Sequence, residues 1–153
     1  MRRRVRHLPW ALYIGLTAAI GIAVPAMADP DAAVLGRWLT QDRNGVFEIG
    51  RCGSTLCGRL VGMRYSGSMP LDVHKQPQCR QMLLSGFLPT DEAGHWRGSI
   101  VNPDSGNSYG ATIWSPEPDV LKLRGYLLLP IFGETQRWNR YRGTIGRACK
   151  LPD

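Results

Sequence analysis

The chain has 153 residues and a formal net charge of +7 at neutral pH. It contains no internal repeat, low-complexity tract or interdomain linker, so its length indicates one globular domain rather than a repeat or multidomain protein. Beyond residue 28 no segment is long and apolar enough to cross a bilayer as a helix, because such a span needs ~20 apolar residues.

Residues 1–28 have the pattern of a cleavable secretory signal peptide. Four arginines stand in the first six positions, an apolar stretch covers residues 10–24, and the segment ends at Ala26-Met27-Ala28 before Asp29. The small alanine side chains fit the narrow subsites of a signal peptidase. A transmembrane anchor is the alternative, but the apolar stretch is shorter than a membrane span. We therefore expect cleavage after Ala28.

Cleavage would fix both the compartment and the size of the mature protein. It leaves a single domain, residues 29–153, that is periplasmic or secreted and has no transmembrane anchor. Lys and Arg fall from 19 to 15 against 12 Asp and Glu, so the net charge falls from +7 to +3. In an exported protein this small charge argues against nucleic acid as a partner. Contacts with anionic lipids or glycans of the cell envelope stay open.

Short runs rich in β-branched and aromatic residues follow, separated by glycine, proline and other turn-forming residues. Strands at roughly 8–12-residue intervals are typical of an antiparallel sandwich or barrel. Residues 64–77 are expected to form a long loop, and residues 82–88 either a strand or a helical turn. The expected strands cover residues 36–41, 46–51, 57–63, 95–101, 108–115, 120–128 and 132–142.

Hydrophobic and polar residues alternate in several of these runs, as a strand with one buried face requires. Phe47 and Ile49 flank Glu48, and residues 121–124 alternate leucine with a basic residue. No segment after residue 28 shows a convincing helical period. The predicted fold class is therefore all-β.

The four cysteines all lie in the mature domain, and an even number in an exported chain indicates disulfides. Cys52 and Cys57 flank a segment typical of a hairpin tip, where their α-carbons could lie within the ~4.4–6.8 Å that a disulfide needs. This pairing leaves Cys79 with Cys149, which would join the C-terminal tail to the middle of the chain. A redox-active dithiol is not favoured because the spacing is not C-x-x-C. No metal site is predicted, since no histidine stands at ligand spacing.

Two features at the ends of the mature domain point to a particular barrel. The first expected strand begins with Gly36-Arg37-Trp38, and the last carries Arg140. Lipocalin-type barrels have a G-x-W on the first strand and a late arginine that packs across the tryptophan. A guanidinium on an indole contributes ~0.5–2 kcal/mol. We therefore expect a small antiparallel lipocalin-like (calycin-type) barrel of about eight strands, closed at one end by Gly36, Trp38 and Arg140.

The mature chain also resembles a bacterial family known as domain of unknown function 2147, over nearly all of residues 36–142. The cysteine hairpin and the last strand make the resemblance specific. The resemblance implies an exported lipocalin-like barrel and no established reaction. The matching segments are Gly36-Arg37-Trp38-Leu39-Thr40, Glu48-Ile49, Cys52-Gly53, Leu56-Cys57-Gly58-Arg59-Leu60, Asp72, Asn102-Pro103-Asp104-Ser105-Gly106 with Tyr109, Leu123-Arg124-Gly125-Tyr126, Phe132-Gly133 and Gln136-Arg137-Trp138-Asn139-Arg140.

A barrel of about eight strands can hold one small ligand. The first functional hypothesis is therefore a periplasmic protein that binds a small apolar or amphipathic molecule, with no cofactor. Tryptophans also stack on sugars, so a glycosyl ligand stays open. For any single aromatic residue, core packing is the better explanation. The candidate ligand-binding residues, which are large or polar groups on barrel strands, are Trp96, Tyr109, Trp114, Arg124, Tyr126 and Trp138.

Two other hypotheses compete with ligand binding. A non-enzymatic interaction module of the envelope would expose an apolar stripe, for which residues 127–132 are the candidate, although closure of the barrel rim explains them better. A hydrolase would use Asp72 and Asp104 as paired carboxylates, as glycosidases do. A loop cap and a turn former are the competing explanations for these two aspartates. Ser105 lies outside a G-x-S-x-G context, so we assign no catalytic residue.

Overall fold

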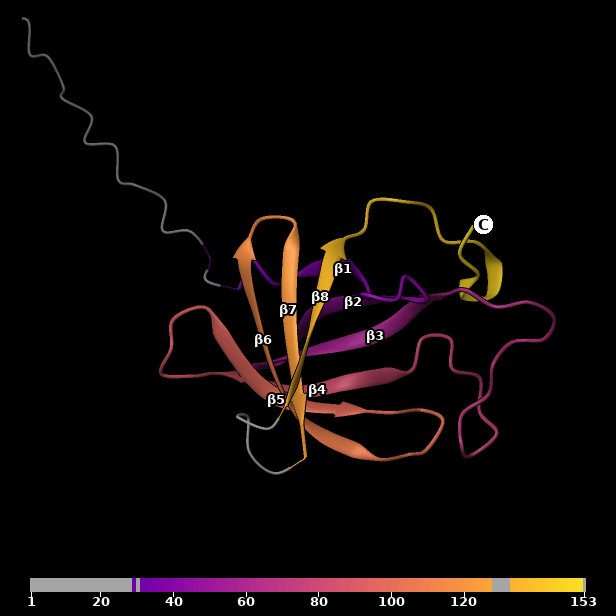
Figure 1. Ribbon diagram of the computed structural model, residues 1–153, viewed down its shortest axis with the longest axis horizontal. Coiled ribbons are helices and arrows are strands. Elements are labelled where there is room, and N and C mark those ends of the chain that lie inside the picture. The colour runs from indigo at the N-terminus through magenta and orange to yellow at the C-terminus, as the bar shows by residue number, and fades with distance from the viewer. Residues whose placement is uncertain (1–28, 30, 128–132, 153) are drawn as a thin grey trace, which may run out of the picture.

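The computed structural model describes residues 29, 31–127 and 133–152. Eight antiparallel strands pair in sequence order, and the last pairs with the first, so that the sheet closes into a barrel (Figure 1). The all-β barrel that the sequence predicts is therefore confirmed. The elements are β1 (Gly36–Leu39), β2 (Gly45–Cys52), β3 (Thr55–Met63), β4 (Met82–Pro89), β5 (His95–Val101), β6 (Ser108–Glu117), β7 (Val120–Tyr126), β8 (Glu134–Arg140) and the 3-10 turn η2 (Arg147–Cys149).

The observed strands follow the predicted ones closely, and β5 has the predicted bounds. The segment that could be a strand or a helical turn is β4, which pairs with both β3 and β5. β8 ends at Arg140, two residues before the predicted end. The predicted signal peptide and residues 128–132, which include most of the candidate apolar stripe, lie outside the described residues.

Much of the barrel interior is built from alternate residues along the strands, although β2, β3 and β7 also bury consecutive residues. Phe47 and Ile49 are buried while Glu48 between them is exposed, as the alternation predicts. Phe87 and Ile113 from the far wall have no exposed surface. Each such side chain contributes ~1.5–3 kcal/mol on burial, so this inner face contributes substantially to the stability of the barrel.

One end of the barrel is closed by Trp38. Its side chain is fully buried, and its Nε1 donates a hydrogen bond to the Val34 carbonyl at 2.8 Å. The guanidinium carbon of Arg140 lies 3.7 Å from the centroid of the Trp38 ring. Gly36 has φ +110°, and a β-carbon there would lie 2.8 Å from Arg140 Nη1. The structure thus brings the three residues of the predicted closure together. Both the positive φ and the lack of space for a β-carbon favour glycine at position 36.

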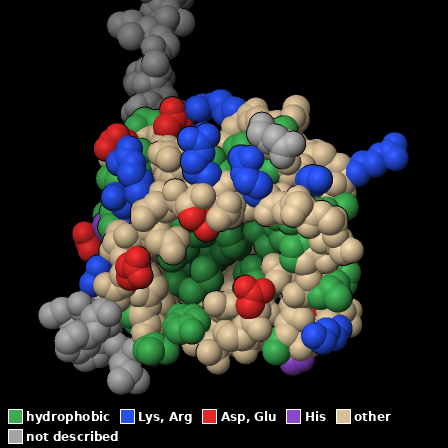
Figure 2. Space-filling view, turned by 45° about the vertical axis from the view of Figure 1, so that its right-hand side comes forward, with side chains coloured by type: hydrophobic (Ala, Val, Ile, Leu, Met, Phe, Trp, Pro, Cys, Tyr) green, Lys and Arg blue, Asp and Glu red, His purple; other side chains and the backbone are tan. Residues whose placement is uncertain are grey.

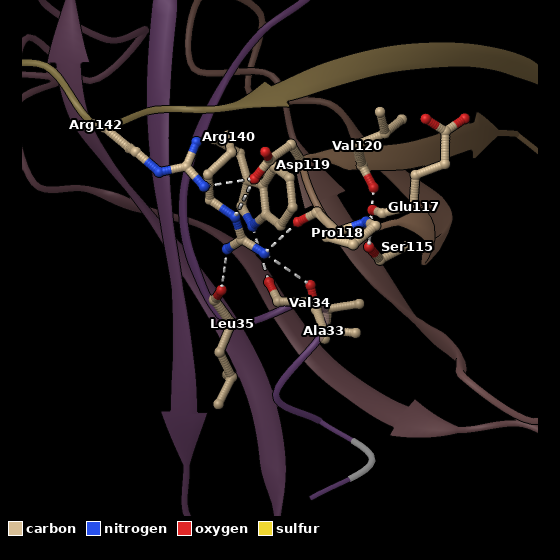
Figure 3. A network of polar contacts seen from close by, with 11 residues as sticks. Ala33, Val34, Leu35, Ser115, Glu117, Pro118, Asp119, Val120, Arg140 and Arg142 are labelled. Carbon is tan, nitrogen blue, oxygen red and sulfur yellow. Dashed lines mark hydrogen bonds and ion pairs between the residues drawn. The ribbon is translucent and has the colours of Figure 1, made fainter. Parts of the chain in front are cut away.

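Arg140 also ties neighbouring segments to this end of the barrel (Figure 3). Its guanidinium donates to the carbonyls of Leu35, Ala33 and Pro118, which come from the N-terminal segment and the β6–β7 turn. Burial lowers the pKa of Arg140, and the nearby Asp119 carboxylate opposes that effect. One side chain therefore joins β1, β8 and the β6–β7 turn into a rigid base.

Both predicted disulfides are confirmed. Cys52–Cys57 closes the β2–β3 hairpin with a Cα–Cα distance of 5.9 Å, and Cys79–Cys149 has a Cα–Cα distance of 5.7 Å. The second disulfide fastens residues 141–152, which we call the C-terminal strap, to the loop before β4. The strap ends beside β3, where Leu151 N donates to the Met63 carbonyl at 2.8 Å.

The two disulfides are expected to differ in their contribution to stability. Their sequence separations are 5 and 70 residues, and the chain-entropy model gives about 2 and about 4 kcal/mol for loops of these sizes. Urea unfolding of Cys52→Ser/Cys57→Ser and Cys79→Ser/Cys149→Ser variants measures the two losses. A larger loss from the hairpin pair would contradict this expectation.

Candidate functional site

The end of the barrel opposite Trp38 is open and hollow. Figure 2 shows a depression with a hydrophobic floor and acidic side chains around it. The hollow has a lobe of about 660 Å³ and an adjoining lobe of about 720 Å³. Both lobes are lined by Ile100, Asn102, Tyr109 and Gln136, so they are parts of one opening. Each lobe alone has a volume within the ~300–1,000 Å³ that is usual for a small-molecule site.

The floor of the opening is apolar. Phe47 and Trp138 stack with their ring centroids 4.9 Å apart, and Leu60 and Ile100 also line the cavity. Trp138 Nε1 donates to Gln136 Oε1 at 2.8 Å, so its polar atom is satisfied and the Gln136 amide is held in place. An apolar group of a ligand can therefore bury its surface here without leaving the buried Trp138 Nε1 unpaired.

The rim of the opening is polar and carries acidic groups. Asp42, Asp104 and Glu134 line it, and Arg64 is the only basic residue among the described residues that do. Partial burial opposes ionisation of Asp42, but hydrogen bonds from Thr40 and Asn44 outweigh it and lower the pKa of the carboxyl. The rim therefore carries negative charge at neutral pH.

Two loops form one wall of the opening. Gln78 is 7% exposed, and its Nε2 donates to the Leu71 carbonyl at 3.1 Å and to Asp104 Oδ1 at 2.8 Å. Val73 N donates to the Pro103 carbonyl at 2.8 Å. These contacts join the loop between β3 and β4 to the loop between β5 and β6. A buried glutamine thus fixes the shape of the wall.

Asp72 caps one of these loops. Its Oδ1 accepts hydrogen bonds from the backbone N–H groups of His74 and Gln76, and its Oδ2 accepts one from Gln81 Nε2 at 2.7 Å. The backbone hydrogen bond from Gln76 is the largest of the effects that lower the pKa of Asp72. A carboxyl held in its ionised form is a poor general acid, so this arrangement favours the loop-cap explanation over the hydrolase hypothesis.

The stabilising effect of Asp72 is expected to depend on pH. A carboxyl whose pKa is lowered by folding stabilises the fold above its unfolded pKa of about 3.8, and this effect is lost as pH falls through the folded pKa. Asp72→Asn should therefore destabilise the protein at about pH 7 and have less effect at about pH 3. Urea unfolding at the two pH values measures this, and equal destabilisation at both would contradict it.

Three of the six predicted ligand-binding residues lie at the opening. Tyr109 lines both lobes and Trp138 forms part of the floor. Tyr126 borders the second lobe, but its ring covers Gly110, its cross-strand partner on β6. A β-carbon on Gly110 would lie 2.4 Å from Tyr126 Cε2. Part of the Tyr126 ring therefore packs against Gly110 of the sheet.

The other three predicted residues lie away from the opening. Trp96 is 7% exposed within the core, and its Nε1 has no hydrogen-bond partner in the part of the chain that the structure describes. Trp114 stacks on His95 with ring centroids 5.0 Å apart. Arg124 Nη1 donates to Thr135 Oγ1, its cross-strand partner, at 2.8 Å. Ile113 and Leu123, the neighbours of Trp114 and Arg124, are buried, so alternation turns Trp114 and Arg124 to the outer face.

Several lining residues were not among the predicted ones. Phe47, Ile100 and Gln136 line the opening, and a sequence signal for them exists. Gln136 stands two positions before Trp138 on β8 and so shares its face. Ile100 shares the face of Trp96 on β5, and Phe47 shares the face of Ile49 on β2, on either side of the exposed Glu48. Selecting residues by face rather than by size would have found all three.

Comparisons with known proteins agree with this architecture. A family model described as "Uncharacterized protein conserved in bacteria (DUF2147)" matches residues 36–140. The chain belongs to this family. The match runs from the glycine of the G-x-W to the arginine that covers its tryptophan, and it confirms the resemblance seen in the sequence. No protein of curated function matches the chain significantly.

A solved structure of a protein from Helicobacter pylori shows the same fold. It is described as "Protein HP1028 from the human pathogen Helicobacter pylori belongs to the lipocalin family". It is 15% identical to this chain with a TM-score of 0.61, and the match covers 70% of this chain and 82% of that one. At this identity the likeness shows that the DUF2147 chain has a lipocalin-like barrel.

Neither a cluster of metal-binding side chains nor a membrane-spanning helix is found among the described residues. These residues hold no group of three or more His, Cys, Asp or Glu side chains that could bind a metal ion. They also include no helix of the length and apolarity that a membrane crossing requires.

Proposed function

We propose that the mature DUF2147 protein is an exported, periplasmic or secreted carrier that binds one small amphipathic molecule in the open end of its barrel. The observation that carries this proposal is a hollow with an apolar floor and a polar rim, in a barrel whose other end is closed by Trp38 and Arg140. Two disulfides support export, because such bonds persist in oxidising compartments. The signal-peptide pattern of residues 1–28 points the same way.

The lining favours a particular kind of amphipathic molecule. Phe47, Ile100 and Trp138 offer apolar contacts to its hydrocarbon part, and Tyr109 offers a ring at the junction of the two lobes. The acidic rim is complementary to a neutral or cationic head group and repels an anionic one. The proposed ligand therefore carries an apolar body and a head group without negative charge.

No comparable observation supports either of the two competing hypotheses, the envelope interaction module and the hydrolase. Of the candidate apolar stripe only Leu127 is described, with 77% of its surface exposed. Asp72 and Asp104 accept hydrogen bonds from Gln81 and Gln78 and serve to shape the loops. We propose neither an envelope interaction module nor a hydrolase.

Calorimetric titration with three probes of equal chain length tests the proposal. The probes are monolaurin, dodecyltrimethylammonium and laurate, which are neutral, cationic and anionic. We expect the first two to bind the mature protein with a negative heat-capacity change, which marks burial of apolar surface, and laurate to bind more weakly. Absence of binding by all three, or tightest binding by laurate, would overturn the proposal.

A further inference from the structure

A second cleft lies on the outside of the barrel, beneath the C-terminal strap. It has a volume of about 500 Å³ and lies between strap residues 145–149 and the outer faces of β1, β2 and β3. In Figure 1 the strap is the yellow segment that leaves β8 and reaches the end of β3, where η2 lies. None of the residues that line this cleft lines the opening of the barrel.

The cleft gathers basic side chains from distant parts of the chain. Arg37, Glu48 and Arg59 form a cross-strand row on β1, β2 and β3, and all three are exposed. Arg80 enters from the loop before β4, and Arg147 from the strap. Four arginines and a single acidic residue thus line the cleft.

The single carboxylate is already engaged. Arg37 Nε lies 2.9 Å from Glu48 Oε1, which neutralises one of the four positive charges. No described carboxylate lies within ion-pair distance of Arg59, Arg80 or Arg147. Like charges held together in a cleft raise the local concentration of anions. The positive charges of Arg59, Arg80 and Arg147 in the cleft are therefore not balanced by a described carboxylate.

The strap keeps two of these arginines together. Cys79 immediately precedes Arg80 and Cys149 follows Arg147 by two residues, so their disulfide joins the two arginine-bearing segments. Tyr65 Oη donates to the Ala148 carbonyl at 2.9 Å and holds the same part of the strap. Arg80 and Ala148 adopt left-handed backbone conformations, with φ of 67° and 55°, which non-glycine residues rarely adopt. The chain thus adopts an unfavourable backbone conformation in both of the segments that carry these arginines.

We propose that this cleft, which we call the arginine groove, binds a phosphate-bearing anion. A guanidinium presents paired N–H donors that match two phosphate oxygens, and charge-assisted bonds of this kind are the strongest hydrogen bonds in proteins. The volume of the groove exceeds that of one phosphate, so it suits a diphosphate, a phosphorylated small molecule or a phospholipid head group. This site is separate from the cavity and of opposite charge preference.

Titration of the mature, disulfide-bonded protein tests the proposal. The probes are inorganic pyrophosphate, followed by calorimetry, and phosphatidylcholine vesicles with and without phosphatidic acid, followed by co-sedimentation. We expect Arg80→Ala/Arg147→Ala to weaken phosphate binding about tenfold or more. The matched control is Arg97→Ala/Arg137→Ala, which removes the same charge from exposed positions on β5 and β8 and should leave binding unchanged.

The outcomes distinguish a soluble phosphate ligand from a lipid head group, and the arginine groove from the cavity of the barrel. Binding of pyrophosphate would support the groove with a soluble ligand, and binding of phosphatidic acid vesicles alone would support it with a lipid head group. Absence of binding by both probes, or equal weakening in the control, would overturn the proposal. A variant that fills the cavity, Ile100→Trp, should retain phosphate binding, so failure of the carrier proposal is distinguishable from failure of this one.

Discussion

Replacing Trp38 by alanine is expected to destabilise the barrel by ~3–5 kcal/mol. The side chain is fully buried, its Nε1 hydrogen-bonds to the Val34 carbonyl, and its ring lies under the Arg140 guanidinium. The substitution removes this packing and leaves a void beneath a charged group that binds three carbonyls. Both the transfer of apolar surface and the loss of the cation–π contact contribute to the cost.

Urea unfolding of the mature protein measures this loss, and Trp114→Ala is the matched control. Trp114 is also a strand tryptophan, but it lies half-buried on the outer face against His95. Its removal should cost much less than removal of Trp38, because neither a cavity nor a network is left behind. Equal losses from the two variants would show that the closed end is no more important than the outer wall.

Filling the cavity with Ile100→Trp is expected to lower the affinity for monolaurin by about tenfold or more. Ile100 lines both lobes of the opening. A tryptophan there extends into space that the proposed ligand would occupy, and it suits a strand by its intrinsic preference. Binding should fall while the stability of the barrel changes little.

Ser99→Trp is the control for this variant, because it places the same side chain next door on the opposite face of β5. Calorimetric titration of the two variants and the wild type measures the difference. If Ile100→Trp binds monolaurin as well as Ser99→Trp does, the site of binding lies elsewhere on the molecule.

Local patterns were sufficient to predict most of the barrel. The alternation around Glu48 predicts β2, and the four residues between Cys52 and Cys57 predict the hairpin that β2 and β3 form. The pairing of Cys79 with Cys149 then follows from counting. The contact between Trp38 and Arg140, which are far apart in sequence, was predictable because the resemblance to lipocalin-type barrels links the two positions.

The same alternation rule, applied consistently, would have improved the prediction of the cavity. Arg124 follows Leu123, which is buried, so the rule turns Arg124 outward. Trp114 follows Ile113 in the same way. Size and polarity selected these two residues, whereas the face of the strand decides which residues meet a ligand.

Other features depend on contacts that no local pattern reveals. The wall of the cavity depends on Gln78. Its side chain hydrogen-bonds to Asp104, which lies 26 residues later in the sequence, and so joins two loops. The arginine groove forms only because the strap brings Arg147 back over β3. Loops joined by side-chain hydrogen bonds follow neither the strand nor the helix period, and so their arrangement appears only in three dimensions.

Native mass spectrometry of the protein, purified gently from its own host, tests the carrier proposal most directly. We expect a disulfide-bonded chain that carries the added mass of one small molecule, which is lost on denaturation and absent from Ile100→Trp. A bare chain for both proteins, at the mass of the disulfide-bonded polypeptide, would contradict a ligand carried in the barrel.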